Sequence, residues 1–143
     1  ENALPKALSH GMRQRVALAR TFAMGSQLLL MDEPFGALDS QTRVVMQEIL
    51  TNMWQRLRIS VLFITHDIDE AVFLADRVIV LNIAPGGIHS ELDIALPRPR
   101  SNLKTRRLPA FLDYRNELME RISQVMGAAE AIANPTRQPE LTA

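Results

Sequence analysis

The stretch Leu28–Asp39, "LLLMDEPFGALD", joins an apolar run to two adjacent carboxylates, a proline and a glycine. Two further short runs of branched apolar residues follow, Val61–Ile64 ("VLFI") and Val78–Leu81 ("VIVL"). None of the three alternates with polar residues, which is typical of strands covered on both faces in a parallel sheet. The runs therefore predict three strands of one parallel sheet.

Helical stretches separate these runs. The first is expected over Ser40–Leu57, and its apolar face is expected to comprise Val45, Ile49, Met53 and Leu57. A shorter helix follows Asp67, which has Glu70 three residues on, as in a capping box with Asp as the cap. Strands that alternate with helices predict βαβ units, so the expected fold class is α/β with a parallel-sheet core.

Polar residues follow each predicted strand. The first run leads into Asp32 and Glu33, the second into Thr65–Asp67, and the third into Asn82. Ligands of parallel sheets gather outside the carboxyl ends of the strands. We therefore expect these side chains to converge on one edge of the sheet.

The residue types at that edge favour phosphoryl chemistry. Asp32 offers an oxygen ligand to a hard cation such as Mg²⁺. Glu33 would orient or deprotonate a nucleophilic water, and His66 would hydrogen-bond a transferring phosphoryl oxygen. Asp67 and Asp39 have a simpler reading, as N-caps of the helices that follow them.

The stretch Leu8–Arg20, "LSHGMRQRVALAR", opens a helix predicted over Ser9–Met24 with arginines in its first two turns, and no carboxylate occurs from Asn2 to Met31. A helix N-terminus carries partial positive charge and normally attracts acidic residues. A bound anion from outside the chain would complete this arrangement, since a helix N-terminus with small residues is well suited to binding phosphate. The alternative is a Ser9 N-cap with a solvated basic face.

Composition narrows the class of protein. The 143 residues are 47% hydrophobic, and sixteen basic residues balance sixteen acidic ones, so no global charge points to nucleic acid or an anionic membrane. The absence of cysteine excludes a disulfide scaffold and a thiolate metal site, and makes the cytosol the simplest compartment. No apolar run approaches the roughly 20 residues of a membrane span. Because Glu1 comes first, we expect the sequence to begin inside a longer protein.

Three segments in order, "LSHGMRQRVALARTF", "LLLMDEPFGALD" and "VLFITHD", resemble the C-terminal part of an ATP-binding-cassette (ABC) ATPase. The resemblance covers Leu4 to about Leu96. It implies a partial P-loop NTPase fold with a parallel-sheet core, a signature helix at the N-terminus and a C-terminal helical tail. It also implies ATP and Mg²⁺ as cofactors.

The resemblance assigns roles residue by residue. Leu8–Met12 resembles the signature motif, and the residues implied to bind the ATP held by the opposite subunit are Ser9, His10, Gly11 and Met12. Asp32 and Glu33 resemble Walker B, with Asp32 near Mg²⁺, through water, and Glu33 as the catalytic glutamate. Gly36–Asp39 resembles the D-loop, in which Asp39 communicates across the dimer, and His66 matches the switch histidine that contacts the γ-phosphate.

Two departures from the family pattern stand out. His10 replaces the usual glycine of the signature, which we interpret as a tolerated substitution, although the imidazole could weaken the site or add a donor. No G-x-x-x-x-G-K-[ST] loop occurs, and the glutamine loop is also missing. In the family the P-loop strand is expected between the strands that carry Glu33 and His66. Without it we expect exposed apolar strand edges, and no ATP binding or hydrolysis by these 143 residues alone.

The detailed sequence of the motifs and of the segments around them indicates the kind of ABC protein. "GMRQRVALAR", "MDEPFGALD", "THDIDEAVFLADRVIVL" and "LPRPR" before a terminal helix resemble the ATPase of a bacterial importer of the nitrate, sulfonate or taurine type. That resemblance implies a homodimer peripheral to the cytoplasmic face of the inner membrane, bound to transmembrane permease subunits and served by a solute-binding protein, with no nucleic-acid partner. The solute is not encoded here.

Three alternatives stay open. One is a soluble ABC ATPase of DNA repair or translation, and another is a non-hydrolysing regulatory fragment. The third is an unrelated metal-dependent phosphohydrolase built from Asp32, Glu33, His66 and Asp67.

The predicted organisation is residues 1–96 as the C-terminal part of an ABC ATPase domain, 97–126 as a basic loop and helix, and 127–143 as a disordered tail. Within it, Ile88–Leu96 is expected as an edge strand or hairpin arm. "PRPRSNLKTRR" is expected as a solvated basic loop, and Pro109 as the start of an amphipathic helix to about Met126.

Overall fold

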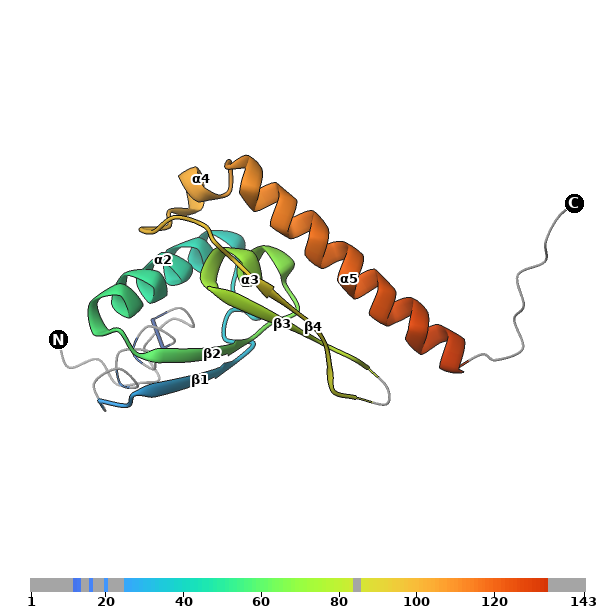
Figure 1. Ribbon diagram of the computed structural model, residues 1–143. Helices are drawn as coiled ribbons and strands as arrows, with labels where there is room; N and C mark the ends of the chain where they lie inside the picture. The colour runs from blue at the N-terminus through green and yellow to red at the C-terminus, as the bar shows by residue number, and fades with distance from the viewer. Residues whose placement is uncertain (1–11, 14–15, 17–19, 21–24, 84–85, 134–143) are drawn as a thin grey trace, which may run out of the picture. The chain divides into compact units, whose positions relative to one another are not determined.

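A computed structural model of the chain describes residues 12–13, 16, 20, 25–83 and 86–133. Its elements are β1 (Leu28–Asp32), α2 (Ser40–Leu57), β2 (Ser60–Ile64), α3 (Ile68–Leu74), β3 (Arg77–Leu81), β4 (Ile88–Asp93), α4 (Asn102–Thr105) and α5 (Pro109–Ala133) (Figure 1). The chain divides into two compact units. Unit 1 takes the described residues within 1–67 and 97–104, and unit 2 takes those within 68–96 and 105–133.

Unit 1 is built on a parallel β1–α2–β2 unit, as predicted. The two strands pair directly, with Leu28 opposite Ser60 and Asp32 opposite Ile64. The ladder continues past β1, because the Glu33 N–H donates to the Ile64 carbonyl at 2.9 Å. Among the described residues no further strand lies between β1 and β2. Direct pairing brings the two strand ends within hydrogen-bond distance of each other.

The bounds of α2 match the predicted helix, but its buried face differs. Its buried residues are Met46, Gln47, Leu50 and Thr51. The predicted face was wrong at Val45 and Leu57, which are 41% and 49% exposed. The buried face includes two polar residues, Gln47 and Thr51. The Thr51 hydroxyl donates a hydrogen bond to the Gln47 carbonyl at 3.0 Å, which satisfies it inside the helix. A helix face predicted only from the spacing of apolar residues therefore omits polar residues that are buried in this way.

The β1–β2 pair has one open face among the described residues. Leu29 and Met31 are buried, whereas Leu28 and Leu30, which alternate with them, are 55% and 67% exposed. On β2, Leu62 and Ile64 are each 53% exposed. The expectation of strands covered on both faces is therefore not met for the described strands, because apolar side chains lie exposed on one face of the pair.

The basic segment after Leu96 folds back on α2 within unit 1, which corrects the expectation of a solvated loop. Arg100 is only 4% exposed. The guanidinium of Arg98 lies 4.1 Å from the ring centroid of Trp54, within the range of a cation–π contact. The Asn102 amide donates to the Val44 carbonyl at 3.3 Å. These arginines serve packing, and α4 begins inside the predicted loop.

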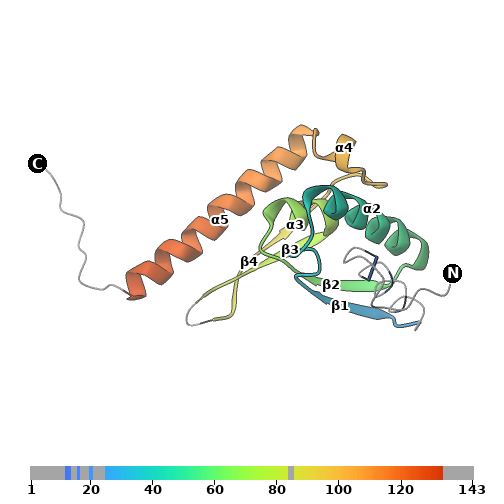
Figure 2. The same ribbon diagram turned by 180° about the vertical axis from the view of Figure 1, so that it is seen from behind.

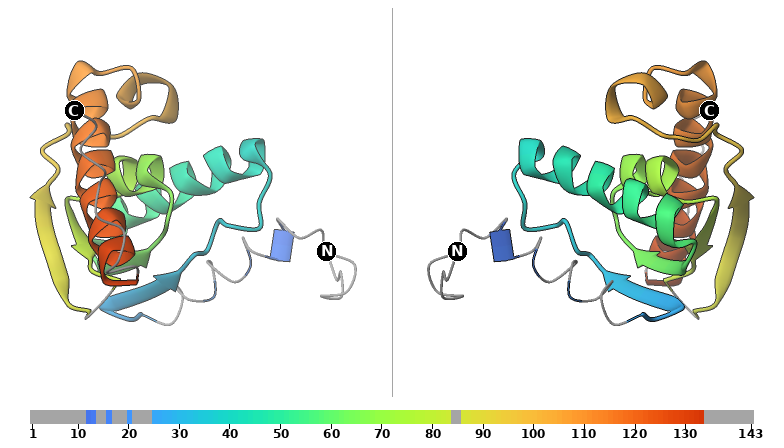
Figure 3. Two further views of the ribbon diagram at one scale, coloured as in Figure 1. Left: turned by 90° about the vertical axis from the view of Figure 1, so that its right-hand side faces the viewer. Right: turned by 90° about the vertical axis from the view of Figure 1, so that its left-hand side faces the viewer.

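Unit 2 is an antiparallel β3–β4 hairpin with helices α3 and α5 on one side of it (Figures 2 and 3). Its buried core comprises Val72, Phe73, Val80, Ile94, Leu96, Phe111, Leu118 and Val125. The hairpin arm predicted after Gly87 is confirmed as β4. The prediction that Val78–Leu81 joins the parallel sheet is wrong for the described strands, because β3 pairs with β4 alone. Asn82 closes the hairpin, its N–H donating to the Gly87 carbonyl at 2.9 Å.

Helix α5 begins at Pro109 as predicted but runs to Ala133, beyond the expected end near Met126. A glycine inside a helix costs about 1 kcal/mol relative to alanine. The residues after Gly127 are mostly alanine, the best helix former, so the helix continues through it. The part of the predicted tail after residue 133 lies outside the described residues. None of the described helices is both long and apolar enough to cross a membrane.

Candidate functional site

Three of the described residues predicted for the site, Asp32, Glu33 and His66, lie at the carboxyl ends of β1 and β2. Asn82, which was expected at the same edge, lies instead in the β3–β4 hairpin of unit 2. Asp32 is the last residue of β1 and is exposed, and Glu33 follows it. His66 lies two residues after the end of β2. Because the strands are parallel neighbours, both ends open on one edge of unit 1, as the sequence predicted.

Glu33 and His66 contact each other directly. The Nδ1 atom of His66 lies 2.9 Å from Oε1 of Glu33. The side chains are 74% exposed for His66 and 50% exposed for Glu33, so the pair faces solvent. A carboxylate only accepts hydrogen bonds, so this contact places the proton on Nδ1 of the imidazole.

The backbone of Glu33 adopts a conformation that is unusual for a residue with a side chain. Its φ is +42°, in the left-handed region, which costs a non-glycine residue free energy and is found disproportionately at functional sites. The Gly36 N–H donates to the Glu33 carbonyl at 3.2 Å and closes a tight turn. From this turn the Glu33 carboxylate contacts His66.

Phe35 anchors this turn. Its side chain is fully buried, and its ring centroid lies 5.5 Å from that of Phe63 on β2, with the planes tilted by 47°. Such tilted aromatic pairs contribute about 0.5–1.5 kcal/mol beyond the area they bury. The turn that carries Glu33 thus packs against the less exposed face of β2, the strand that precedes His66.

Asp39, in the segment that resembles the D-loop, caps α2. Its Oδ1 accepts the N–H groups of Gln41 and Thr42 at 3.1 and 3.0 Å. Hydrogen bonds from the side chain and backbone of Thr42, and then from the Gln41 N–H, lower the pKa of this carboxyl below its ordinary value of 3.8. Here the carboxylate does the work of an N-cap, the simpler of the two readings of Asp39.

Asp67 makes an ion pair across unit 1. Its Oδ2 lies 3.1 Å from Nη1 of Arg43, on the first turn of α2. Its backbone N–H donates to the Thr65 hydroxyl at 3.0 Å. In the part of the chain with described placement, no group of three or more His, Cys, Asp or Glu side chains is arranged to hold a metal ion. Asp67 is thus turned to a structural pairing, which weakens the phosphohydrolase alternative.

The signature motif lies almost wholly outside the described residues. That holds for Ser9, His10 and Gly11, so their predicted roles stay predictions. Met12 is described, is helical and is 49% exposed. Gly25, directly after the predicted helix Ser9–Met24, has a φ of +67°, which glycine adopts without strain.

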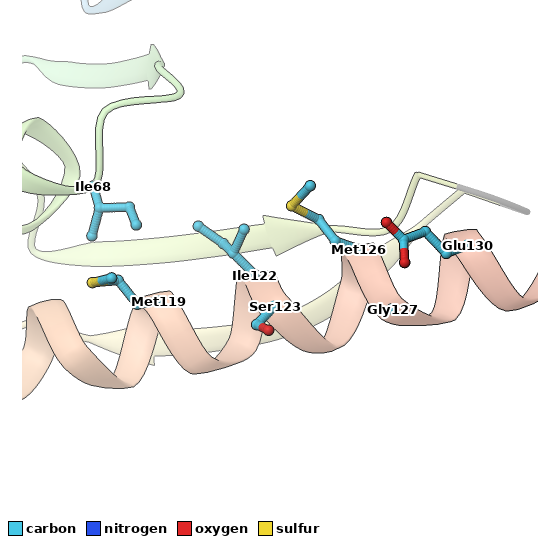
Figure 4. A pocket seen from close by; sticks show the side chains of 7 residues that line it. All are labelled: Ile68, Met119, Ile122, Ser123, Met126, Gly127 and Glu130. Carbon is cyan, nitrogen blue, oxygen red and sulfur yellow. The ribbon is translucent and has the colours of Figure 1, made fainter. Parts of the chain in front are cut away.

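Unit 2 carries a separate shallow hollow between α5 and the start of α3 (Figure 4). It is lined by Ile68, Met119, Ile122, Ser123, Met126, Gly127 and Glu130. The lining is mostly apolar, with a single ionisable side chain. It includes none of the residues predicted for phosphoryl chemistry.

Known proteins resemble this chain closely. A family model described as ABC transporter matches residues 1–36. The nitrate import ATP-binding protein NrtD of Synechocystis sp. is 53% identical over 121 residues, 81% of this chain and 46% of that protein. The chain belongs to the ABC transporter ATP-binding family. The aliphatic sulfonates import ATP-binding protein SsuB of Bacillus cereus (strain ZK / E33L) is 42% identical over 120 residues, 84% of this chain and 46% of that protein.

An uncharacterized ABC transporter ATP-binding protein of Methanocaldococcus jannaschii is 48% identical over 119 residues, covering 83% of the chain and 43% of that protein. The chain therefore spans about half the length of the curated relatives it matches. The resemblance to the ABC family, including relatives named as nitrate and sulfonate importers, is confirmed. The roles of single site residues in this ABC chain remain predictions.

Sequence reasoning missed two residues that shape the site, Phe35 and Arg43. Phe35 reads as one apolar residue in a loop, and its burial depends on Phe63, far away in sequence. Arg43 carried a usable signal, because a basic residue in the first turn opposes the helix dipole and no acidic residue lies in that turn of α2. Such a residue calls for a carboxylate from elsewhere, which Asp67 supplies.

Proposed function

We propose that this chain supplies the Walker B, D-loop, switch and signature residues of an ATP-hydrolysing subunit of a bacterial ABC importer. The observation that carries the proposal is the 2.9 Å contact between Glu33 and His66 at the open edge of a parallel strand pair, beside Asp32. A carboxylate and an imidazole held together next to a second carboxylate are suited to activating water against a phosphate.

Asp32 fits a site for Mg²⁺. It is an exposed carboxylate at a strand end, and Mg²⁺ in nucleotide sites is held by one or two carboxylates, the phosphates and several waters. When bound, Mg²⁺ would neutralise charge on the phosphoryl group that is transferred.

Glu33 and His66 divide the remaining work. The Glu33 carboxylate orients the attacking water and accepts its proton. With Nδ1–H of His66 donating to Glu33, the opposite ring nitrogen, Nε2, donates to a phosphoryl oxygen when the ring is an imidazolium. The left-handed backbone of Glu33 and the buried ring of Phe35 preorganise this pair.

The assembly proposed for the whole protein is a homodimer. Ser9–Met12 of one copy would contact the ATP seated on its partner, at a helix N-terminus that no acidic side chain of its own neutralises. The dimer would lie on the cytoplasmic face of the inner membrane, against transmembrane permease subunits that a solute-binding protein serves. The names of the nitrate and sulfonate import relatives support a small anionic or organic solute.

The 143 residues alone are proposed to be inactive. They contain no phosphate-cradling loop of the P-loop pattern. The exposed leucines of β1 and the exposed Leu62 and Ile64 of β2 support packing against a further part of the protein. The principal nucleotide seat would lie in that part.

Magnesium-dependent ATP hydrolysis, measured for the 143-residue chain and for the native protein that contains it, tests this proposal. Turnover by the native protein and none by the 143 residues is expected. Turnover by the 143 residues alone would contradict the proposal and favour the phosphohydrolase built from Asp32, Glu33, His66 and Asp67. ATP-dependent solute uptake by vesicles that hold the native protein and its permease tests the importer assignment.

A further inference from the structure

Arg43 joins two segments that the predicted mechanism treats separately. Its Nη2 donates to the carbonyl of Leu38, in the segment that resembles the D-loop, at 3.3 Å. Its Nη1 donates to Oδ2 of Asp67, the residue directly after the switch histidine, at 3.1 Å. The planar fork of a guanidinium bridges two acceptors in fixed geometry, which a lysine ammonium does not reproduce.

Asp67 carries this link to His66. Its backbone N–H donates to the Thr65 hydroxyl at 3.0 Å, which closes a short turn with His66 at its centre. Fixing the Asp67 carboxylate therefore restrains the turn that presents the imidazole. The Arg43 and Asp67 side chains are 33% and 31% exposed, so this ion pair is better shielded from solvent than the Glu33–His66 contact.

The Glu33–His66 contact needs such support. Ion pairs exposed to solvent contribute only about 0–1 kcal/mol and do not hold two side chains in one geometry by themselves. The position of Glu33 is fixed by its turn and Phe35, and that of His66 by β2 and the Thr65–Asp67 turn. Arg43 is hydrogen-bonded to both of these segments. It contacts the Glu33 segment at Leu38, which lies between Glu33 and α2, and it contacts the His66 turn at Asp67.

We propose that Arg43 is a positioning residue that couples the D-loop segment to the turn carrying the switch histidine. Its assigned role is to act through Leu38 and Asp67 and not on the nucleotide itself. Movement of the segment Gly36–Asp39, where the partner subunit is expected to approach, would be transmitted through Arg43 and Asp67 to His66. This role rests on the proposed ATPase function, and it goes beyond that function by assigning a connection between two of its parts.

The test compares Arg43→Ala, Arg43→Lys and Asp67→Asn in the native protein that contains this chain. Arg56→Ala is the matched control, because Arg56 is an exposed arginine near the opposite end of α2. In Arg43→Ala, kcat for ATP hydrolysis is expected to fall about tenfold or more with KM nearly unchanged, since small misplacements of reacting groups are costly. Arg43→Lys and Asp67→Asn are expected to lie between this variant and the native protein.

A second readout does not depend on ATP hydrolysis. The imidazole carbon and nitrogen NMR signals of His66, assigned by their loss in His66→Gln, report its contact with Glu33. In Arg43→Ala these signals are expected to shift toward those of Glu33→Gln, and in Arg56→Ala to stay in place. The Arg43→Ala/Asp67→Asn double variant is expected to be no worse than Arg43→Ala alone, because the Asp67 carboxylate acts through its contact with Arg43.

The outcomes separate this inference from the proposed function. If Arg43→Ala leaves both kcat and the His66 signals as in Arg56→Ala, the positioning role is wrong even though the ATPase function stands. A loss of stability alone, with kcat and the His66 signals unchanged, also overturns it. If the native protein hydrolyses no ATP, the proposed function fails, and the His66 signals still decide whether Arg43 sets the contact with Glu33.

Discussion

Replacing Phe35 by alanine tests whether the turn that carries Glu33 is held by its buried aromatic anchor. Phe35 is fully buried, and its ring centroid lies 5.5 Å from that of Phe63. Removing the ring leaves a cavity that the surrounding strands fill only in part. Glu33, two residues earlier and in a left-handed conformation, then loses the packing that offsets its strain.

The expected loss follows from burial and from the ring pair. Truncation of a fully buried phenylalanine to alanine lowers the free energy of unfolding by about 3–5 kcal/mol. Of this, about 0.5–1.5 kcal/mol comes from the tilted contact with Phe63. Phe35→Leu keeps most of the apolar volume, so its loss is expected to be clearly smaller.

Urea denaturation of the native protein, followed by circular dichroism, measures these free energies. Leu57→Ala is the control, because Leu57 is 49% exposed on α2 in the same unit. Its effect is expected within about 0.5 kcal/mol of zero. A loss below about 1 kcal/mol for Phe35→Ala, well short of the buried range, would refute the idea that this ring anchors the turn.

Three further predictions concern other parts of the chain. In unit 2, Leu118→Ala is expected to cost about 2–5 kcal/mol of unfolding free energy, because Leu118 is 1% exposed, and Leu112→Ala, 46% exposed on the same helix, is the control in the same denaturation assay. The lowered pKa of Asp39 means that its cap stabilises the fold above the ordinary value of 3.8 and is lost as pH falls through the lowered value. Asp39→Asn, which still caps, should therefore show a smaller fall in melting temperature on acidification, and an equal fall would contradict this. His10→Gly is expected to leave ATP hydrolysis by the native protein unchanged or raised, and a large loss would show that the imidazole has a role.

The sequence located the elements better than it located their partners. The bounds of α2 could be predicted because Asp39 caps it and periodic apolar residues continue to Leu57. The strands β1 and β2 could be predicted from short branched runs. Both signals are local, and each is set by residues within a few positions of one another.

Pairing could not be predicted in the same way. The run Val78–Leu81 has the composition of a buried parallel strand, yet it pairs with β4 in a hairpin, since a nearby partner in sequence competes for the same hydrogen bonds. Strand order depends on contacts distant in sequence, which no short motif specifies.

The candidate site was partly predictable. Parallel strands end at the same edge, so the meeting of Asp32, Glu33 and His66 followed from strand direction alone. The ion pair of Arg43 with Asp67 did not follow, because it joins a helix and a loop 24 residues apart. The basic segment with Arg98 was expected to be solvated, and its contact with Trp54 depends on a tertiary fold-back.

The most direct test of the central claim is the rate of ATP hydrolysis by the native protein with Glu33 replaced by glutamine. Glutamine keeps the size of the side chain and removes the base, so kcat is predicted to fall by about 10²–10⁴-fold, the usual contribution of a general base. ATP binding, measured separately by equilibrium titration, is predicted to persist. A kcat within about twofold of the native value would contradict the account, because Glu33 would then not act in the transition state.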